Sequence, residues 1–169
     1  MVVEDDAFVA LTMGVLRPRI IISTGLLNMF QEKEAEAILL HEHYHYIHRD
    51  PLKSILFTIM VDGLGYIPII KAIAGYYKIW KELLADRFVI RQMRSEFYLG
   101  SVLLCLTKWV NLNRPVEAVY FTESAINYRI LQILEPEKPL HIPFLHMKSI
   151  MVSVSILFIM VSVVIGGCT

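Results

Sequence analysis

The stretch from residue 149 to residue 168, SIMVSVSILFIMVSVVIGGC, contains no charged side chain over twenty positions. A helix of that length rises about 30 Å, which is the thickness of the hydrocarbon core of a bilayer. A buried strand is the alternative, because β-branched residues are frequent, but strands rarely reach this length. The sequence therefore predicts a transmembrane helix over 149–168. The 56% hydrophobic content of the chain indicates either that part of it lies in lipid or that its core is unusually large.

Lysine and arginine are frequent between residues 71 and 148, and neither occurs after Lys148. The positive-inside rule then places the middle of the chain in the cytosol and the C-terminus outside the cell membrane. The formal net charge is zero and the sequence has no dense basic run, so we expect no nucleic-acid partner. The two cysteines, Cys105 and Cys168, are too isolated to form a disulfide framework or a zinc–thiolate site.

The rest of the chain predicts a mainly α fold with a little β-structure at the N-terminus. Two β-rich runs within residues 7–22 flank a Gly14–Pro18 turn and predict a hairpin or an edge sheet. Either Ser23 or Thr24 can cap the helix that follows. Further helices, some amphipathic and some apolar, are expected over residues 31–48, 76–95, 97–110 and 117–134.

Residues 51–70, PLKSILFTIMVDGLGYIPII, form a second apolar stretch, but it is interrupted by Asp62, two glycines and Pro68. An aspartate inside the bilayer costs about 3 kcal/mol on insertion scales. Two interpretations of residues 52–70 therefore stay open. One is a membrane-embedded segment, kinked or re-entrant, and the other is a helix in the core or at the membrane interface.

The stretch LHEHYHYIHRDP, residues 40–51, contains the pattern H-E-x-x-H in His41, Glu42 and His45. Histidines four residues apart lie on the same face of a helix, so both imidazoles can reach one metal ion. Glu42, beside the first of them, is placed to hold a water molecule and take a proton from it. His43 points away from this face, and His48 lies about 10 Å from His41 along the helix axis, too far to share the ion.

A catalytic zinc ion needs a third protein ligand and an open position. Glu82 in WKELLADRFVI is the best candidate, and Asp86, on the same helix face, could accept a hydrogen bond from a ligand histidine. Spacing alone leaves open a charged helix face that pairs with neighbouring basic residues. The weaker rivals for the third ligand are Glu96, Glu117 and Glu123.

These residues together resemble a known family. In their order and spacing, LLHEHYHYIHRDP, GYIPII and KELLADRFVI are similar to the BlaR/MecR-type membrane zinc metallopeptidases, which include the sensor-transducers of β-lactam resistance. The stretches GVLRPRIIISTGLL and NYRILQIL also fit, so the resemblance covers roughly residues 7–166. The HtpX/Ste24 type of membrane protease is the nearest alternative, but the short gap between His45 and Glu82 favours the BlaR type.

The resemblance implies a gluzincin metallopeptidase domain in residues 1–148, with one zinc ion (Zn2+) per chain. It implies that His41, His45 and Glu82 bind zinc and that Glu42 is the general base. The implied activity is hydrolysis of peptide bonds in a protein substrate at a cytosolic site beside the lipid bilayer. A role in signal transduction, such as the regulation of antibiotic resistance, is implied as well.

The resemblance further implies that Asp86 supports the zinc ligands and that Asp50 is a helix-boundary residue. We expect a donor that stabilises the oxyanion of the reaction. Arg129 is the first candidate for this donor, with Tyr128 and His141 as alternatives. A substrate would add as an extended segment to an edge strand near residues 8–22.

Two other functional classes are compatible with the same residues. One is a non-catalytic membrane module that binds zinc, although such a module has no need of Glu42. The other is a metal transporter or sensor, which would need ionisable residues in its spans, and 149–168 has none.

Overall fold

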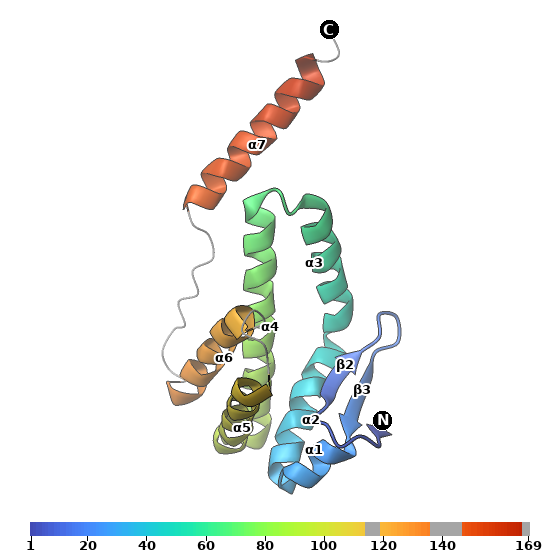
Figure 1. Ribbon diagram of the computed structural model, residues 1–169. Coiled ribbons are helices and arrows are strands. Elements are labelled where there is room, and N and C mark those ends of the chain that lie inside the picture. The colour runs from blue at the N-terminus through green and yellow to red at the C-terminus, as the bar shows by residue number, and fades with distance from the viewer. Residues whose placement is uncertain (114–118, 136–146, 167–169) are drawn as a thin grey trace. The chain divides into compact units, whose positions relative to one another are not determined.

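The structure, a computed structural model, describes residues 1–113, 119–135 and 147–166, with side chains described for 1–108, 126–135 and 147–165. The described residues are mainly helical, as predicted, and a small sheet lies at the N-terminus (Figure 1). The elements are β1 (Val2–Val3), β2 (Ala10–Met13), β3 (Arg19–Ser23), α1 (Thr24–Met29), α2 (Glu32–Ile47), α3 (Asp50–Leu64), α4 (Pro68–Met93), α5 (Phe97–Asn113), α6 (Val119–Leu134) and α7 (Met147–Gly166).

The sheet has the strand order β1-β3-β2, and β2 and β3 form the predicted antiparallel hairpin with Ala10 opposite Ile22. Gly14 in the turn has a φ of +105°, and a Cβ there would lie 2.8 Å from the carbonyl oxygen of Arg17. The turn therefore needs glycine. β1 pairs in parallel with β3 and was not predicted, because its two residues carry no periodic signal.

Helix α1 begins directly after β3, and Ser23 is its N-cap. The Ser23 Oγ accepts a hydrogen bond from the backbone N–H of Leu26 at 3.2 Å and donates to the carbonyl oxygen of Ala7 at 2.7 Å. Of the two capping candidates in the sequence, the structure therefore selects Ser23. Ser23 is fully buried and is also the last residue of β3, so this cap joins the sheet to the helix.

Helix α2 carries the H-E-x-x-H pattern and lies beside the β2–β3 hairpin (Figure 1). The acidic side chains of its first turn interact favourably with the positive end of the helix dipole. The backbone N–H of Gln31 also donates to the carboxylate of Glu34 at 3.0 Å. The buried residues of α2 are Ala37, Ile38, His41 and His45. The two histidines thus continue the face that packs into the core.

Two apolar clusters pack against that face of α2. The first joins α2 to the sheet, α1 and α5 through Ile22, Leu26, Phe30, Ile38 and Val102. The second joins α2 to α4 and α5 through Ala37, Val89, Leu99 and Leu103. Together they fix α2 between its neighbours and so fix the positions of its histidines.

The chain divides into two compact units. The first comprises Met1–Lys53 and Ile79–Leu140, and it contains the residues of the predicted site. The second comprises Ser54–Lys78 and His141–Thr169, and it contains α7 together with most of the stretch 52–70.

The stretch 52–70 is not one continuous helix. Helix α3 ends at Leu64 and α4 begins at Pro68, and the stacked rings of Phe57 and Tyr77, 4.3 Å between centroids, join the two helices. The 15 residues of α3 rise roughly 22 Å, less than a hydrocarbon core. Its exposed apolar residues include Ile55, Leu56, Ile59 and Met60. A location of this segment in lipid stays a prediction.

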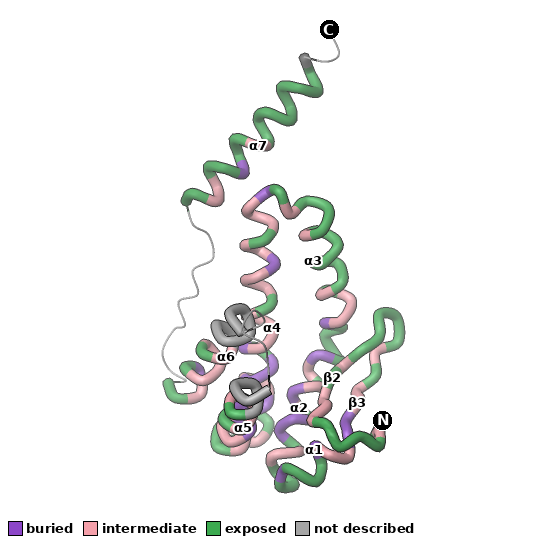
Figure 2. The backbone as a smooth tube through the Cα atoms, viewed as in Figure 1, coloured by how far each residue is buried: buried purple, intermediate pink, exposed green. Residues whose placement is uncertain are grey.

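Helix α7 is long and apolar enough to cross a membrane. Over Met147–Ile165 its mean hydropathy is 2.3 and only 6% of the window is buried. Figure 2 shows α7 exposed along almost its whole length. Among the described residues it is the one helix with these properties, and it coincides with the predicted span at 149–168.

Candidate metal centre and active site

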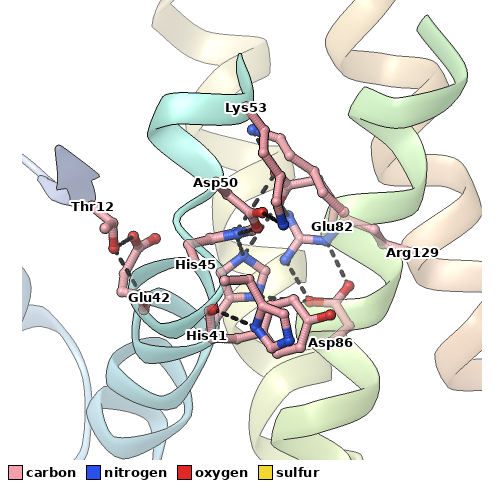
Figure 3. Close-up of polar contacts among 12 residues, drawn as sticks. Thr12, His41, Glu42, His45, Asp50, Lys53, Glu82, Asp86 and Arg129 are labelled. Atoms are coloured by element: carbon pink, nitrogen blue, oxygen red, sulfur yellow. Dashed lines mark hydrogen bonds and ion pairs between the residues drawn. The ribbon is translucent and has the colours of Figure 1, made fainter. Parts of the chain in front are cut away.

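The structure brings His41 and His45 of α2 together with Glu82 of α4 (Figure 3). The two Nε2 atoms lie 3.1 Å apart, and the His41 Nε2 lies 3.2 Å from Glu82 Oε2. One ligand atom from each residue falls within 4.8 Å of the others, so the three side chains could hold a metal ion. Both histidines are buried, and Glu82 is about three-quarters buried.

The chemistry of this donor set fits zinc. Bonds from zinc to imidazole nitrogen are about 2.0–2.1 Å, so two such nitrogens in a tetrahedral site lie about 3.3 Å apart. The 3.1 Å between the two Nε2 atoms is close to that separation. Two buried nitrogen lone pairs that face each other also need a proton or a cation between them. Two imidazoles and one carboxylate leave the fourth position open, as in catalytic zinc sites.

The outer nitrogen of each histidine faces a carboxylate. The Nδ1 of His45 lies 2.7 Å from Oδ2 of Asp50, which is itself buried. The Nδ1 of His41 lies 3.0 Å from Oδ1 of the fully buried Asp86, at ion-pair distance although without hydrogen-bond geometry. A carboxylate beside Nδ1 favours the proton on that nitrogen, so the Nε2 lone pair faces the metal position.

Arg129 of α6 anchors the carboxylate of Asp86. Its Nε and Nη2 donate to the two carboxylate oxygens at 2.6 and 2.8 Å, which is a bidentate pair. Its Nη1 lies 3.5 Å from Oε2 of Glu82. Arg129 therefore contacts both carboxylates that α4 contributes to the site.

The charges in this centre determine its protonation. Burial raises the pKa of Glu82, but the neighbouring His41 and His45 and the charge of Arg129 outweigh burial and hold this pKa well below its ordinary value. Burial lowers the pKa of His41, but the Asp86 and Glu82 carboxylates outweigh it and raise the pKa to about 9. Without metal the His41 imidazole is therefore protonated on both nitrogens at neutral pH, and a bound cation would displace one of the two protons.

The carboxylates of Asp50 and Asp86 stay ionised as well. Burial raises the pKa of Asp86, but the charge of Arg129 outweighs burial and lowers this pKa. Burial likewise raises the pKa of Asp50, but the hydrogen bond to His45 outweighs burial and lowers it. Lys53 adds to the second effect, because its Nζ donates to Oδ1 of Asp50 at 3.1 Å.

The side chain of Glu42 projects from α2 toward the sheet. Its Oε2 lies 2.8 Å from the hydroxyl of Thr12 on β2, and Figure 3 shows the side chain directed toward Thr12. Glu42 also lines a cavity of about 190 Å³ together with His41, Glu82 and Arg129. The other lining residues are apolar: Phe8, Ala10, Ile38, Leu99, Val102 and Leu106.

The remaining candidates lie elsewhere. His43 is exposed and stacks with Tyr46, and His48 is exposed and stacks with Tyr44, so neither faces the cluster. Tyr128 is half-buried and does not line the cavity, and Glu96 is exposed. His141, Glu117 and the side chain of Glu123 lie outside the described residues.

Four contacts at the site were not predicted from the sequence, and the first is the bidentate pair of Arg129 with Asp86. Asp50 was expected only to bound a helix, yet it holds His45. Arg49, with a φ of +51°, turns the chain between α2 and α3 and brings Asp50 back toward His45. Lys53 and Thr12 were not expected to contribute. The spacing H-x-x-x-x-D from His45 to Asp50 was the one available signal, but a left-handed arginine is too rare to be predicted.

Of the three comparisons with known proteins, one gave a match. No curated protein and no solved structure gave a match. Residues 6–133, which include the cluster, Glu42, Asp86 and Arg129, match the family model described as BlaR1 peptidase M56. This match covers more than half of the chain, and with α7 it indicates a membrane-associated metallopeptidase. The chain therefore belongs to the M56 family of BlaR1-type peptidases.

Proposed function

We propose that the protein is a zinc-dependent endopeptidase of the membrane that hydrolyses peptide bonds in a protein substrate. The observation that carries the proposal is the convergence of His41, His45 and Glu82 in a buried cluster, beside a cavity that Glu42 also lines. A site that bound zinc only for structure would need no carboxylate free to act as a base.

Bound zinc would polarise the carbonyl of the scissile bond and make a nearby water more acidic. Glu42 takes a proton from that water, whose oxygen then bonds to the carbonyl carbon. When the carbon–nitrogen bond breaks, Glu42 passes this proton to the leaving amine. The products are a carboxylic acid and an amine, and Glu42 returns to its ionised state.

Arg129 stays our candidate for the donor to the developing oxyanion. Its guanidinium lines the cavity, and the charge is fixed because burial, which lowers the pKa of Arg129, is outweighed by the Asp86 carboxylate, which raises it. Two of its three nitrogens already donate to Asp86. The remaining nitrogen, Nη1, would therefore make the contact.

The substrate would bind as an extended strand along β2. In the described sheet β2 is an edge strand, and its Ala10 lines the cavity. Backbone hydrogen bonds to an edge strand hold a peptide regardless of its side chains. The apolar part of the cavity wall would then receive one apolar side chain of the substrate.

We further propose that the active site faces the cytosol and that α7 carries the C-terminus to the outside. The basic residues before Lys148 and their absence after it support this orientation. A role in signal transduction stays a prediction from the family resemblance.

The test is peptide cleavage by the full chain in detergent micelles with one equivalent of zinc, using a mixture of quenched fluorescent decapeptides. Glu42→Gln should retain zinc and lose cleavage by at least about a hundredfold, since it removes the general base. Glu36→Gln, an exposed glutamate on the same helix, is the matched control and should cleave normally. Zinc binding without cleavage by the wild type would instead favour the non-catalytic zinc-binding module.

A further inference from the structure

The general base Glu42 has a partner on the sheet. The Thr12 hydroxyl lies 2.8 Å from Oε2 of Glu42 and also 2.8 Å from its main-chain carbonyl oxygen. Thirty residues separate Thr12 from Glu42 in the chain, so the contact is set by the packing of β2 on α2 and not by local sequence. Thr12 is half-buried, which protects the contact from competition by water.

Of the two acceptors on Glu42, the carboxylate is the stronger one for the Thr12 hydroxyl. A hydroxyl has one proton to donate, and an ionised carboxylate accepts a shorter and stronger hydrogen bond than a carbonyl oxygen. When the Thr12 hydroxyl donates its hydrogen bond to Oε2 of Glu42, the other carboxylate oxygen, Oε1, stays available to hold a water. The same bond restricts the Glu42 side chain, which otherwise has three rotatable bonds.

The strand that carries Thr12 also lines the site. Side chains alternate along β2, so Ala10 and Thr12 share the half-buried face while Leu11 and Met13 are exposed. Ala10 lines the cavity, and Thr12 holds Glu42. The orientation of the Glu42 carboxylate is therefore tied to the edge strand whose Ala10 lines the cavity.

We propose that Thr12 is a positioning residue that orients the general base Glu42 from edge strand β2. The inference rests on the proposed peptidase function, because it deepens the role of Glu42 in it. Thr12 contacts neither the three metal ligands nor the cavity in the described contacts, so its effect should pass through Glu42 alone.

The first test compares cleavage of the quenched decapeptides by Thr12→Val, Thr12→Ser and Thr24→Val. Thr12→Val keeps the shape of the side chain and removes the donor, so kcat should fall on the order of tenfold with KM within about twofold. Thr12→Ser should restore kcat. Thr24→Val removes a hydroxyl whose hydrogen bonds are to Asp5 and not to Glu42, and should cleave as the wild type does. An unchanged kcat in Thr12→Val, or equal losses in Thr24→Val, would overturn the proposal.

The second test needs no catalysis. Thermal midpoints of the zinc-free chain are measured for Thr12→Val, Glu42→Ala and the double variant. If Thr12 donates to the Glu42 carboxylate, Thr12→Val lowers the midpoint in the wild type and has little further effect beside Glu42→Ala. Equal effects in both backgrounds would assign the hydroxyl to the main-chain oxygen and reject the positioning role. A wild type that cleaves nothing would refute the peptidase and leave this contact measurable.

Discussion

The metal centre buries charged side chains, whereas helix α7 exposes apolar ones. Around the centre, charged groups leave water: Asp86 is fully buried and Asp50 is 4% exposed. On α7, apolar groups face outward: Phe158 is 73% exposed and Met151 is 69% exposed. Each arrangement is costly in water by itself, so each needs a compensating environment.

The two regions find this compensation in different places. Asp86 is compensated within the protein by Arg129, as Asp50 is by His45 and Lys53. For α7, the compensation would come from lipid, which solvates apolar side chains at no cost. We therefore expect that removal of a pairing charge destabilises the centre, and that addition of a charge to α7 weakens its insertion into a membrane.

Removal of a pairing charge should have the largest effect. Arg129→Met leaves the buried Asp86 without its bidentate partner, which we expect to lower the free energy of unfolding by about 3–5 kcal/mol. Arg91→Met, at an exposed position of α4, should change it by less than about 0.5 kcal/mol. Denaturant unfolding of both variants in the same detergent measures the difference. Equal stabilities would mean that Asp86 does not depend on Arg129.

Addition of a charge to α7 should come next. Phe158→Lys places an ammonium group near the centre of the Met147–Ile165 window and should cost about 3 kcal/mol of membrane insertion. Ile165→Lys makes a similar change at the end of the same window, where the side chain can reach the interface, and should cost little. The inserted fraction of each variant in microsomes gives the comparison. If both lysines are tolerated equally, α7 does not cross a membrane.

Loss of a carboxylate that only orients a ligand should have the smallest effect. Asp50→Ala frees Nδ1 of His45, which we expect to weaken zinc binding by about 10–100-fold. Asp62→Ala removes an exposed aspartate from the same helix and is the control. Competition titration against a chromophoric chelator measures both affinities. Matching affinities would show that the contact between Asp50 and His45 does not support the metal site.

The parts of the fold that depend on local sequence were predicted well. Ser23 was one of two capping candidates, the helix around His41 has strong helix formers, and the 149–168 run has no charge to interrupt it. These signals arise within a few helical turns. Helical spacing alone also places His41 beside His45 and Glu82 on a face with Asp86. It left open whether Glu82 binds metal or pairs with basic residues, and the family resemblance supplied Glu82 as a ligand.

The contacts that the sequence could not provide depend on tertiary structure or on rare backbone geometry. Asp50 reaches His45 only because Arg49 adopts a positive φ. Arg129 was predicted as an oxyanion donor, but its bidentate pairing with Asp86 depends on how α6 packs. The pairing of Thr12 with Glu42 crosses from a strand to a helix. In each case the partner is chosen by packing, which periodicity does not encode.

The most direct test of the account is X-ray absorption at the zinc edge of the full chain loaded with one equivalent of zinc. We predict a shell of two imidazole nitrogens with carboxylate and water oxygens, at about 2.0–2.2 Å and without sulfur. The spectrum should change in His45→Ala and stay the same in His43→Ala, since His43 is exposed and faces away from the cluster. A sulfur-containing shell, or a spectrum that responds to His43→Ala and not to His45→Ala, would contradict the proposed site.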